Sequence, residues 1–226
     1  MNNIFVYIEL EEGTIADVSL ELLTKGRELA DKLGVKLEAV VMGHNVAGVE
    51  KELAKYGADT VWVADDAIFA PFRTLPHTST MCGLIKAEQP QIVLFGATPV
   101  GRDFAPRVSS ALHSGLTADC TQLEIGSFDM KVKDAEGNFV DKHYEDQLYQ
   151  IRPAFGGSII ATIVNPEHRP QMATVRDGVM KKEILDENYK GEVIKHDVAK
   201  YVPETDYVVK VLDRHVEAAK HNLKGA

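Results

Sequence analysis

The stretch Gln91–His113, QIVLFGATPVGRDFAPRVSSALH, joins an apolar strand to a helix through a turn of small residues. Gln91–Phe95 is a short apolar run of the kind found in buried strands. Gly96–Asp103 follows directly, and Phe104–His113 is predicted as a helix with Pro106 in its first turn, where a missing N–H does no harm. This strand–turn–helix order is the building unit of an α/β fold.

The same unit occurs three times earlier in the chain. Strands are predicted at 4–10, 36–42 and 60–64, each followed by a helix, at 20–33 (with Asp17 as N-cap and Gly34 as the stop), 47–56 and 77–88. Leu116–Ile125 is predicted as a fifth strand. The alternation predicts an α/β fold, a Rossmann-like three-layer sandwich with a mainly parallel sheet, helices on both faces and right-handed crossovers.

The pattern changes after residue 125. Residues 126–147 are polar, with a hairpin turn predicted at Glu136-Gly137-Asn138. Further strands are predicted at 147–152, 158–165 and 172–176, and we expect them to extend the sheet as antiparallel strands. We divide the chain into a nucleotide-binding-like α/β domain, residues 1–180, and a segment, residues 181–226. In that segment 191–198 alternates like an edge strand, and 207–220 is predicted as a strand passing into a helix.

Composition disfavours several classes of function. The 226 residues carry a formal net charge of −9, which disfavours nucleic-acid binding, and their 45% hydrophobic content suits a sizeable core. No apolar run approaches the roughly 20 residues that span a bilayer. Acidic residues interrupt the N-terminus where a signal peptide would stay apolar. Because Cys82 and Cys120 are far apart and the histidines are scattered, we expect no metal site and a reducing, cytoplasmic compartment.

The turn Gly96–Asp103 is the first candidate site. Ligands of open α/β sheets gather at the carboxyl ends of strands and helix N-termini favour anions, so Arg102 could pair with a phosphate there. The turn lacks the GxGxxG fingerprint, however, and its Gly-x4-Gly is followed by Arg-Asp where a P-loop has Lys-Ser/Thr. The alternative is a tight turn in which Arg102 or Asp103 serves as a capping or ion-pair residue.

Arginine and glycine are concentrated in Arg152–Arg176, RPAFGGSIIATIVNPEHRPQMATVR. A proline fixes the backbone after Arg152, and Gly156-Gly157 permits positive φ or a close backbone approach. A guanidinium held in this way can donate hydrogen bonds to a carbonyl, a phosphate or a reduced flavin ring. The alternative is a bend between strands, with Arg152 paired to an acidic residue. Arg169 and Arg176 are candidates for an interface or anion contact, or else belong to a solvated edge.

Four motifs together resemble the alpha subunit of electron-transfer flavoproteins. They are Gly96-Ala97-Thr98 with Gly101-Arg102-Asp103, Gly115-Leu116-Thr117-Ala118-Asp119-Cys120, Arg152-Pro153-Ala154-Phe155-Gly156-Gly157 and Arg169-Pro170-Gln171-Met172-Ala173-Thr174-Val175-Arg176. The motifs occur in the order of the family and extend over much of the chain. Asp177 departs from the family, which usually continues with Pro-Gly after the last arginine.

The resemblance implies the N-terminal domain of such a subunit, with the C-terminal domain that holds FAD absent from this chain. In the family, this domain pairs with a beta subunit that binds AMP in ordinary members and a second FAD in electron-bifurcating members. In the latter, the arginine equivalent to Arg152 approaches the flavin ring of the beta subunit, with the Gly156-Gly157 pair beside it. A fixed positive charge there would favour the anionic reduced flavin.

The implied function is that of an electron carrier rather than a catalyst on its own. It would take electrons from flavin- or NADH-linked dehydrogenases and pass them on through FAD in a heterodimer, and both branches of the family stay open. One competing function is a stand-alone adenine-nucleotide-binding module of the stress-protein type, which needs a phosphate loop where Gly96–Asp103 stands. Another is an ATP-pyrophosphatase-like enzyme, which needs a Ser-Gly-Gly loop where Glu9-Leu10-Glu11-Glu12 would repel phosphate.

Overall fold

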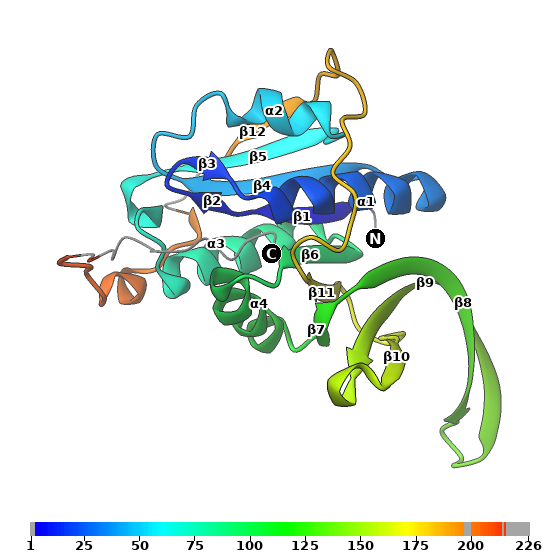
Figure 1. Cartoon of the computed structure of the whole chain (residues 1–226). Helices are drawn as coiled ribbons and strands as arrows, with labels where there is room; N and C mark the ends of the chain where they lie inside the picture. Colours follow the sequence, from blue (N-terminus) through cyan, green and yellow to red (C-terminus); the bar gives the residue numbers. More distant parts are fainter. Residues whose placement is uncertain (1–2, 197–199, 214, 216–226) are drawn as a thin grey trace.

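A seven-stranded sheet forms the centre of the molecule (Figure 1). The structure is a computed structural model that describes residues 3–196, 200–213 and 215. The strand order is β12-β5-β4-β1-β6-β11-β7, and every neighbouring pair is parallel. The strands span Ile4–Ile8 (β1), Leu37–Gly43 (β4), Thr60–Asp65 (β5), Ile92–Gly96 (β6), Leu116–Cys120 (β7), Gln171–Val175 (β11) and Glu192–Lys195 (β12).

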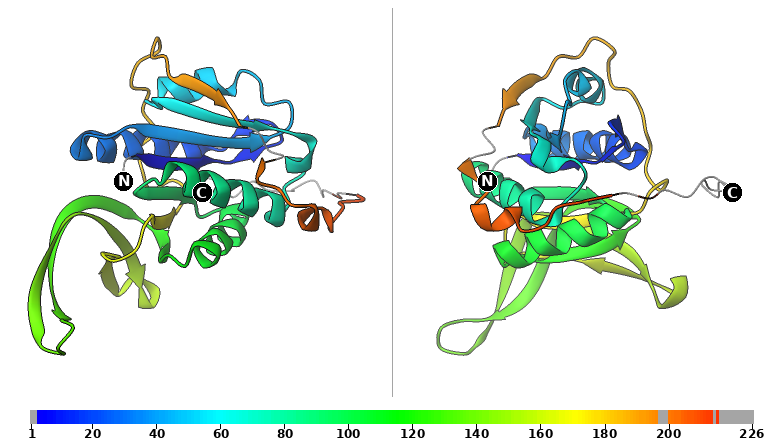
Figure 2. Two further views of the ribbon diagram at one scale, coloured as in Figure 1. Left: turned by 180° about the vertical axis from the view of Figure 1, so that it is seen from behind. Right: turned by 90° about the vertical axis from the view of Figure 1, so that its left-hand side faces the viewer.

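Helices cover both faces of this sheet, as the sequence predicts (Figure 2). The helices span Asp17–Leu33 (α1), Val49–Lys55 (α2), Thr74–Glu88 (α3) and Pro99–Leu112 (α4), with 3-10 turns at Ala67–Phe69 (η1), Phe155–Gly157 (η2) and Glu204–Tyr207 (η4). α1 and α2 lie on one face and α3 and α4 on the other. Because both faces are covered, β1, β4, β6 and β11 are buried along their whole length, which gives the continuous apolar runs seen in the sequence. Within the described residues, no helix combines the length and the apolarity that crossing a bilayer requires.

The predicted stop of α1 is confirmed, and its predicted N-cap is one residue too late. Gly34 stops the helix in a left-handed conformation, with φ 66°, and its N–H donates to the carbonyl of Asp31. Asp17 is the first helical residue, whereas the N-cap position belongs to Ala16. The prediction for α4 is wrong at its start, because Thr98 caps the helix and Pro99 opens it, so that Pro106 falls inside the helix.

A second, antiparallel sheet projects from the main body (Figure 1). It consists of β8 (Gln122–Lys133), β9 (Phe139–Ala154) and β10 (Ile159–Ile163), in the order β10-β9-β8. The short strands β2 (Leu10–Glu11) and β3 (Thr14–Ile15) form a separate hairpin after β1. The predicted turn around Gly137 is confirmed, with φ 88° at that residue.

The antiparallel part differs from the prediction in three ways. The strands expected at 147–152 and 158–165 lie in β9 and β10, which form a sheet with β8 and do not extend the main sheet. The expected strand at 116–125 is two strands, β7 and β8, and the polar stretch 126–147 belongs largely to the long arms of β8 and β9. Residues 128–133 of β8 do alternate between apolar and polar side chains, which is a strand signal that the description of 126–147 as a polar stretch overlooks, although much of the hairpin is exposed. The strand expected at 172–176 is β11, which does not join antiparallel but lies between β6 and β7 and runs parallel to both.

After β11 the chain passes along α1 to the opposite edge of the main sheet. The N–H groups of Gly178 and Met180 donate to the carboxylate of Glu21 on α1. The chain then forms β12, which pairs with β5 at the edge of the sheet, as predicted. No strand or helix follows over residues 208–213, contrary to the prediction for 207–220, and the rest of that range apart from residue 215 lies outside the described residues.

An aromatic cluster fills the α3–α4 face and includes a buried histidine. The ring of His77 lies 4.6 Å from that of Phe72, 4.9 Å from that of Phe69 and 6.0 Å from that of Phe104, centre to centre. His77 Nδ1 is 2.8 Å from the carbonyl oxygen of Arg73 and donates to it in the neutral ring. Burial lowers the pKa of His77 to about 4, because the charged form loses its hydration.

We expect acid to destabilise the fold through His77. Since its pKa is about 4 in the folded chain and about 6.5 when unfolded, the unfolded chain takes up the proton first and stability falls as the pH drops from about 6.5 toward 4. The linkage amounts to about 2 kcal/mol between pH 7 and pH 5. Urea unfolding at both pH values measures it. His77→Phe keeps a ring but no titrating group, so an equal loss of stability in this variant would contradict the assignment.

Candidate functional site

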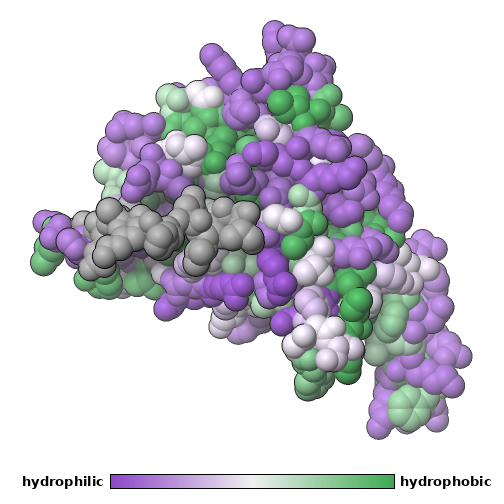
Figure 3. All heavy atoms as spheres, in the orientation of Figure 1, coloured by the Kyte–Doolittle hydropathy of each residue, from purple (hydrophilic) through white to green (hydrophobic). Residues whose placement is uncertain are grey.

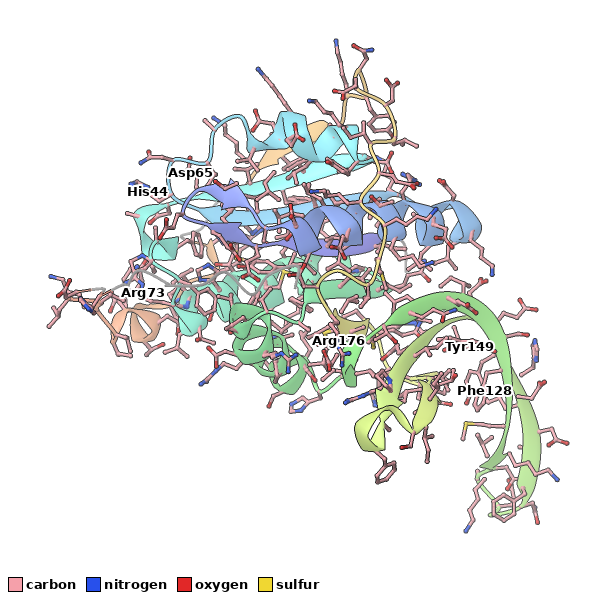
Figure 4. All side chains as sticks on the ribbon, in the orientation of Figure 1. His44, Asp65, Arg73, Phe128, Tyr149 and Arg176 are labelled. Carbon is pink, nitrogen blue, oxygen red and sulfur yellow. The ribbon has the colours of Figure 1, made fainter. Side chains whose placement is uncertain are left out.

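Two arginines meet one carboxylate at the carboxyl edge of the main sheet. Arg176 follows β11, and its Nη2 and Nε donate to the two oxygens of Asp119 at 2.7 and 3.3 Å. Arg102, in the first turn of α4, donates from Nη2 to Asp119 Oδ1 at 3.1 Å and from Nε to the carbonyl of Ala97 at 2.7 Å. Figure 4 places Arg176 where the main sheet meets the projecting sheet. The ion-pair alternative for Arg102 is therefore confirmed.

The backbone places Asp119 at this point. Asp119 has φ 63°, in the left-handed region, and the pairing of β11 with β7 shifts register between Ala173 and Val175. The N–H of Asp119 donates to Thr174 Oγ1 at 2.8 Å, and the N–H of Arg176 donates to the carbonyl of Cys120 at 3.0 Å. The bulge thus aims the carboxylate of β7 at the arginine that ends the neighbouring strand.

Arg152 belongs to the same cluster. It lies on β9 opposite Ala161 of β10, half-buried, and its neighbour Ile151 accepts a hydrogen bond from Thr121, just after β7. The hydrogen bond and charge of Arg176 hold the pKa of the Asp119 carboxyl below its usual value, against burial, and the charges of Arg102 and Arg152 add to the effect. Two of the predicted arginines therefore bond to one aspartate, and a third acts on it through its charge.

The glycine pair after Arg152 forms a left-handed turn at the rim of the cluster. Phe155, Gly156 and Gly157 have φ 48°, 67° and 91°, which confirms the expected need for positive φ at the two glycines. The space beside both glycines is open, and Phe155 is 83% exposed. Apolar surface extends from Phe155 onto β10, where Ile160 is 73% exposed (Figure 3). We call these residues, with Ile159, the β10 surface.

Arg169 lies apart from the other arginines. It precedes β11, at the amino end of the strand, whereas Arg176 follows the carboxyl end. Its Nη1 donates to the carbonyls of Asn165, Pro166 and His168 at 3.0–3.2 Å, and burial lowers the pKa of its guanidinium. Arg169 therefore braces the loop before β11, and the structure does not bring it to the Asp119 cluster.

Side chains of the protein itself occupy the space at the turn after β6, where a ligand could bind. Thr98 Oγ1 accepts from the N–H of Gly101 and donates to the carboxylate of Glu9, which is buried at the end of β1, at 2.5 Å. A Cβ at Gly101 would overlap the carbonyl oxygen of Gly96, so the glycines serve the close contact of α4 with β6. The crevice between β1 and β6, where the strand order reverses, thus holds a carboxylate, which repels phosphate.

The two cysteines lie in the core. Burial raises the pKa of Cys82 to about 11 and that of Cys120 to about 12, although the nearby positive charge of Arg152 acts in the opposite direction on Cys120. Both thiols are therefore protonated at neutral pH and behave as small apolar side chains, as the sequence suggests.

Comparison with known proteins identifies the family. A family model described as "Electron transfer flavoprotein domain" matches residues 4–201 of this chain. The chain belongs to the electron transfer flavoprotein family. This assignment confirms the resemblance carried by the four motifs and goes against the stress-protein alternative.

Named relatives support the assignment to the electron transfer flavoprotein family. The chain is 42% identical to an electron transfer flavoprotein subunit alpha of Thermoanaerobacterium thermosaccharolyticum over 96% of its own length and 60% of that protein. It is 46% identical to the same subunit of Clostridium acetobutylicum, over 79% of this chain and 48% of the other. An acryloyl-CoA reductase electron transfer subunit beta of Anaerotignum propionicum is 37% identical over 98% of this chain and 58% of the other. The chain thus spans between about half and 60% of these relatives.

Sequence reasoning missed the aspartate and the buried acid of this site. Asp119 entered only as one letter of a motif, and nothing local revealed that it would meet Arg102 and Arg176. One signal was available, since a carboxylate between the apolar residues of a short strand needs a partner. The bond between Glu9 and Thr98 joins positions 89 residues apart, and no local pattern predicts it.

We predict that Gly101→Ala destabilises the fold. Helix propensity alone would make alanine more favourable by about 1 kcal/mol, so a loss of stability isolates the overlap with the Gly96 carbonyl. We expect a net loss of about 1–3 kcal/mol in chemical unfolding. Ser110→Ala, on the exposed side of the same helix, is the matched control and should change stability little. A variant as stable as the parent would show that α4 can move away from β6.

Proposed function

We propose that this chain is the N-terminal part of an electron-transfer flavoprotein alpha subunit, working as an electron carrier within a heterodimer. The family match over residues 4–201 supports the class. The observation that carries the proposal to particular residues is the cluster of Arg102, Arg152 and Arg176 around Asp119 at an open edge of the sheet.

The surface of the cluster suits a flavin held mainly by another domain or subunit. FAD supplies, when bound, a ring that accepts and gives up electrons. The guanidinium of Arg152 can donate hydrogen bonds and place positive charge at the edge of such a ring, and Gly156-Gly157 leaves room beside it. The crevice between β1 and β6 does not suit a phosphate, because the Glu9 carboxylate already occupies it. Any AMP of the complex would then belong to the beta subunit.

The β10 surface fits contact with a beta subunit. Phe155, Ile159 and Ile160 are 83%, 52% and 73% exposed, and Ile160 and Ile159 pair with Pro153 and Ala154, the two residues that follow Arg152 on β9. Exposed apolar groups of this size on one sheet mark interaction sites in soluble proteins. A subunit docked there would lie next to the arginine cluster.

The proposal about the electron donors rests on the named relatives, not on any residue described above. One relative carries the name acryloyl-CoA reductase electron transfer subunit beta, which describes that protein as an electron-transfer subunit of a reductase. We extend this to the chain as a proposal that it exchanges electrons with flavin-dependent dehydrogenases in the cytoplasm. Two buried free thiols suit such a reducing compartment. Both the ordinary and the electron-bifurcating branch fit this surface, and the flavin content of the heterodimer distinguishes them.

Assembly and flavin content test the proposed function. We expect the chain copurified with an electron-transfer flavoprotein beta subunit to show a flavin spectrum that the isolated chain lacks. Two FAD per heterodimer would indicate the bifurcating branch, and one FAD with AMP the ordinary branch. Ile160→Asp should weaken assembly at least tenfold without unfolding the chain, because Ile160 is exposed. Tight binding of ATP by the isolated chain would overturn the proposal in favour of a nucleotide-binding module.

The positive charge of Arg152 should raise the reduction potential of an interface flavin. Arg152→Ala removes a charge that stabilises the negatively charged reduced form, so we expect the midpoint potential to become more negative. Spectroelectrochemical titration of the heterodimer measures the shift. Arg169→Ala is the control, since that guanidinium faces backbone carbonyls at the other end of β11. An unchanged potential in Arg152→Ala would remove the tuning role.

A further inference from the structure

Asp119 is placed to control the arginines around it. Its side chain is 19% exposed, whereas those of Arg102 and Arg176 are 58% and 47% exposed. Both long side chains therefore bend from the surface toward one recessed carboxylate. A carboxylate so placed restricts the positions of the guanidinium groups and offsets part of their charge.

The arginines of the cluster differ in how they are held. Both hydrogen bonds recorded for the guanidinium of Arg176 go to Asp119, while Arg102 is also fixed by the carbonyl of Ala97. Among the described residues, no hydrogen bond is recorded from the Arg152 guanidinium, which meets Asp119 through charge alone. Arg102 and Arg176 are thus held by hydrogen bonds to Asp119. The guanidinium of Arg152 is the one whose donors can face a partner.

The backbone of Asp119 adds a second constraint. A non-glycine residue at φ 63° inside a strand is uncommon, and aspartate and asparagine are among the residues that tolerate it best. The N–H bond to Thr174 and the register shift between β7 and β11 hold this conformation. Side-chain charge at this position can therefore be removed by asparagine with little change in the backbone.

We propose that Asp119 is a positioning residue that fixes Arg176 and Arg102 and offsets part of their charge, so that Arg152 is the arginine presented to a flavin. This inference rests on the proposed function, because it concerns the same surface. In this arrangement, Asp119 determines how much positive charge acts on the flavin and from which direction.

The test compares Asp119→Asn with two variants in the flavin-loaded heterodimer. We expect Asp119→Asn to shift the flavin midpoint potential in the positive direction, because a negative charge beside three arginines is lost, and Arg152→Gln to shift it in the negative direction. Asp103→Asn is the matched control: it removes the same charge from α4, where Asp103 pairs with Arg107 instead. We expect it to shift the potential less than Asp119→Asn does.

A second measurement, on the 226-residue chain without flavin, follows the arginines themselves. Nitrogen-15 NMR resolves the Nε–H groups, which Arg102→Lys and Arg176→Lys assign. In Asp119→Asn we expect the Arg176 Nε–H to exchange with water at least several-fold faster. The Arg102 Nε–H, bonded to the Ala97 carbonyl, should be protected as before. A merely structural role would expose both groups together or neither.

The outcomes separate this inference from the function on which it rests. If Arg152→Gln shifts the potential but Asp119→Asn does not, the positioning role is overturned and the electron-carrier function stands. If neither variant shifts it, the positioning role of Asp119 and the tuning role of Arg152 both fail, whereas the electron-carrier function is decided by assembly and flavin content. Unchanged exchange at Arg176 in Asp119→Asn overturns the positioning role whatever the potentials show.

Discussion

The insertion of β11 between β6 and β7 is the constraint on which the rest of the structure depends. Val175 accepts a hydrogen bond from Ala97 after β6, and Arg176 donates one to Cys120 at the end of β7. These bonds bring together segments that lie more than 50 residues apart in the chain. The buried strand β11 could not leave this position without exposing its own backbone groups and those of its two neighbours, β6 and β7.

The projecting sheet is a consequence of that insertion. The chain leaves the main sheet after Cys120 and must return at Gln171, so the residues between them form a closed excursion whose ends meet. Antiparallel pairing of β8, β9 and β10 satisfies the backbone of this excursion and returns Arg152 to the neighbourhood of Asp119. The same path leaves Phe155 and Ile160 exposed, uncovered by any of the residues that the structure describes.

The cluster around Asp119 carries more positive than negative groups, whereas the whole chain is acidic. The formal net charge is −9, yet three arginines share one aspartate at the carboxyl edge of β6, β11 and β7. At ionic strengths near 0.15 M, charges more than about 8 Å away are largely screened, so this edge acts on a nearby partner by its own charges. An acidic composition is therefore compatible with a locally positive cluster of side chains.

Local patterns in the sequence determined much of the fold. The apolar runs of β1, β4 and β6, the αL stop at Gly34 and the edge strand β12 follow from local periodicity and turn chemistry, which act over a few residues. The motifs, taken together, also determined the family. Only the tertiary structure decided that β11 runs parallel, that Glu9 fills the crevice beside Thr98, that Arg169 and Arg176 face opposite ends of a strand, and that Asp119 holds Arg102 and Arg176. These contacts depend on strand order and on a register shift, which are settled by burial and backbone hydrogen bonding across the whole sheet and leave no periodic trace in any local stretch.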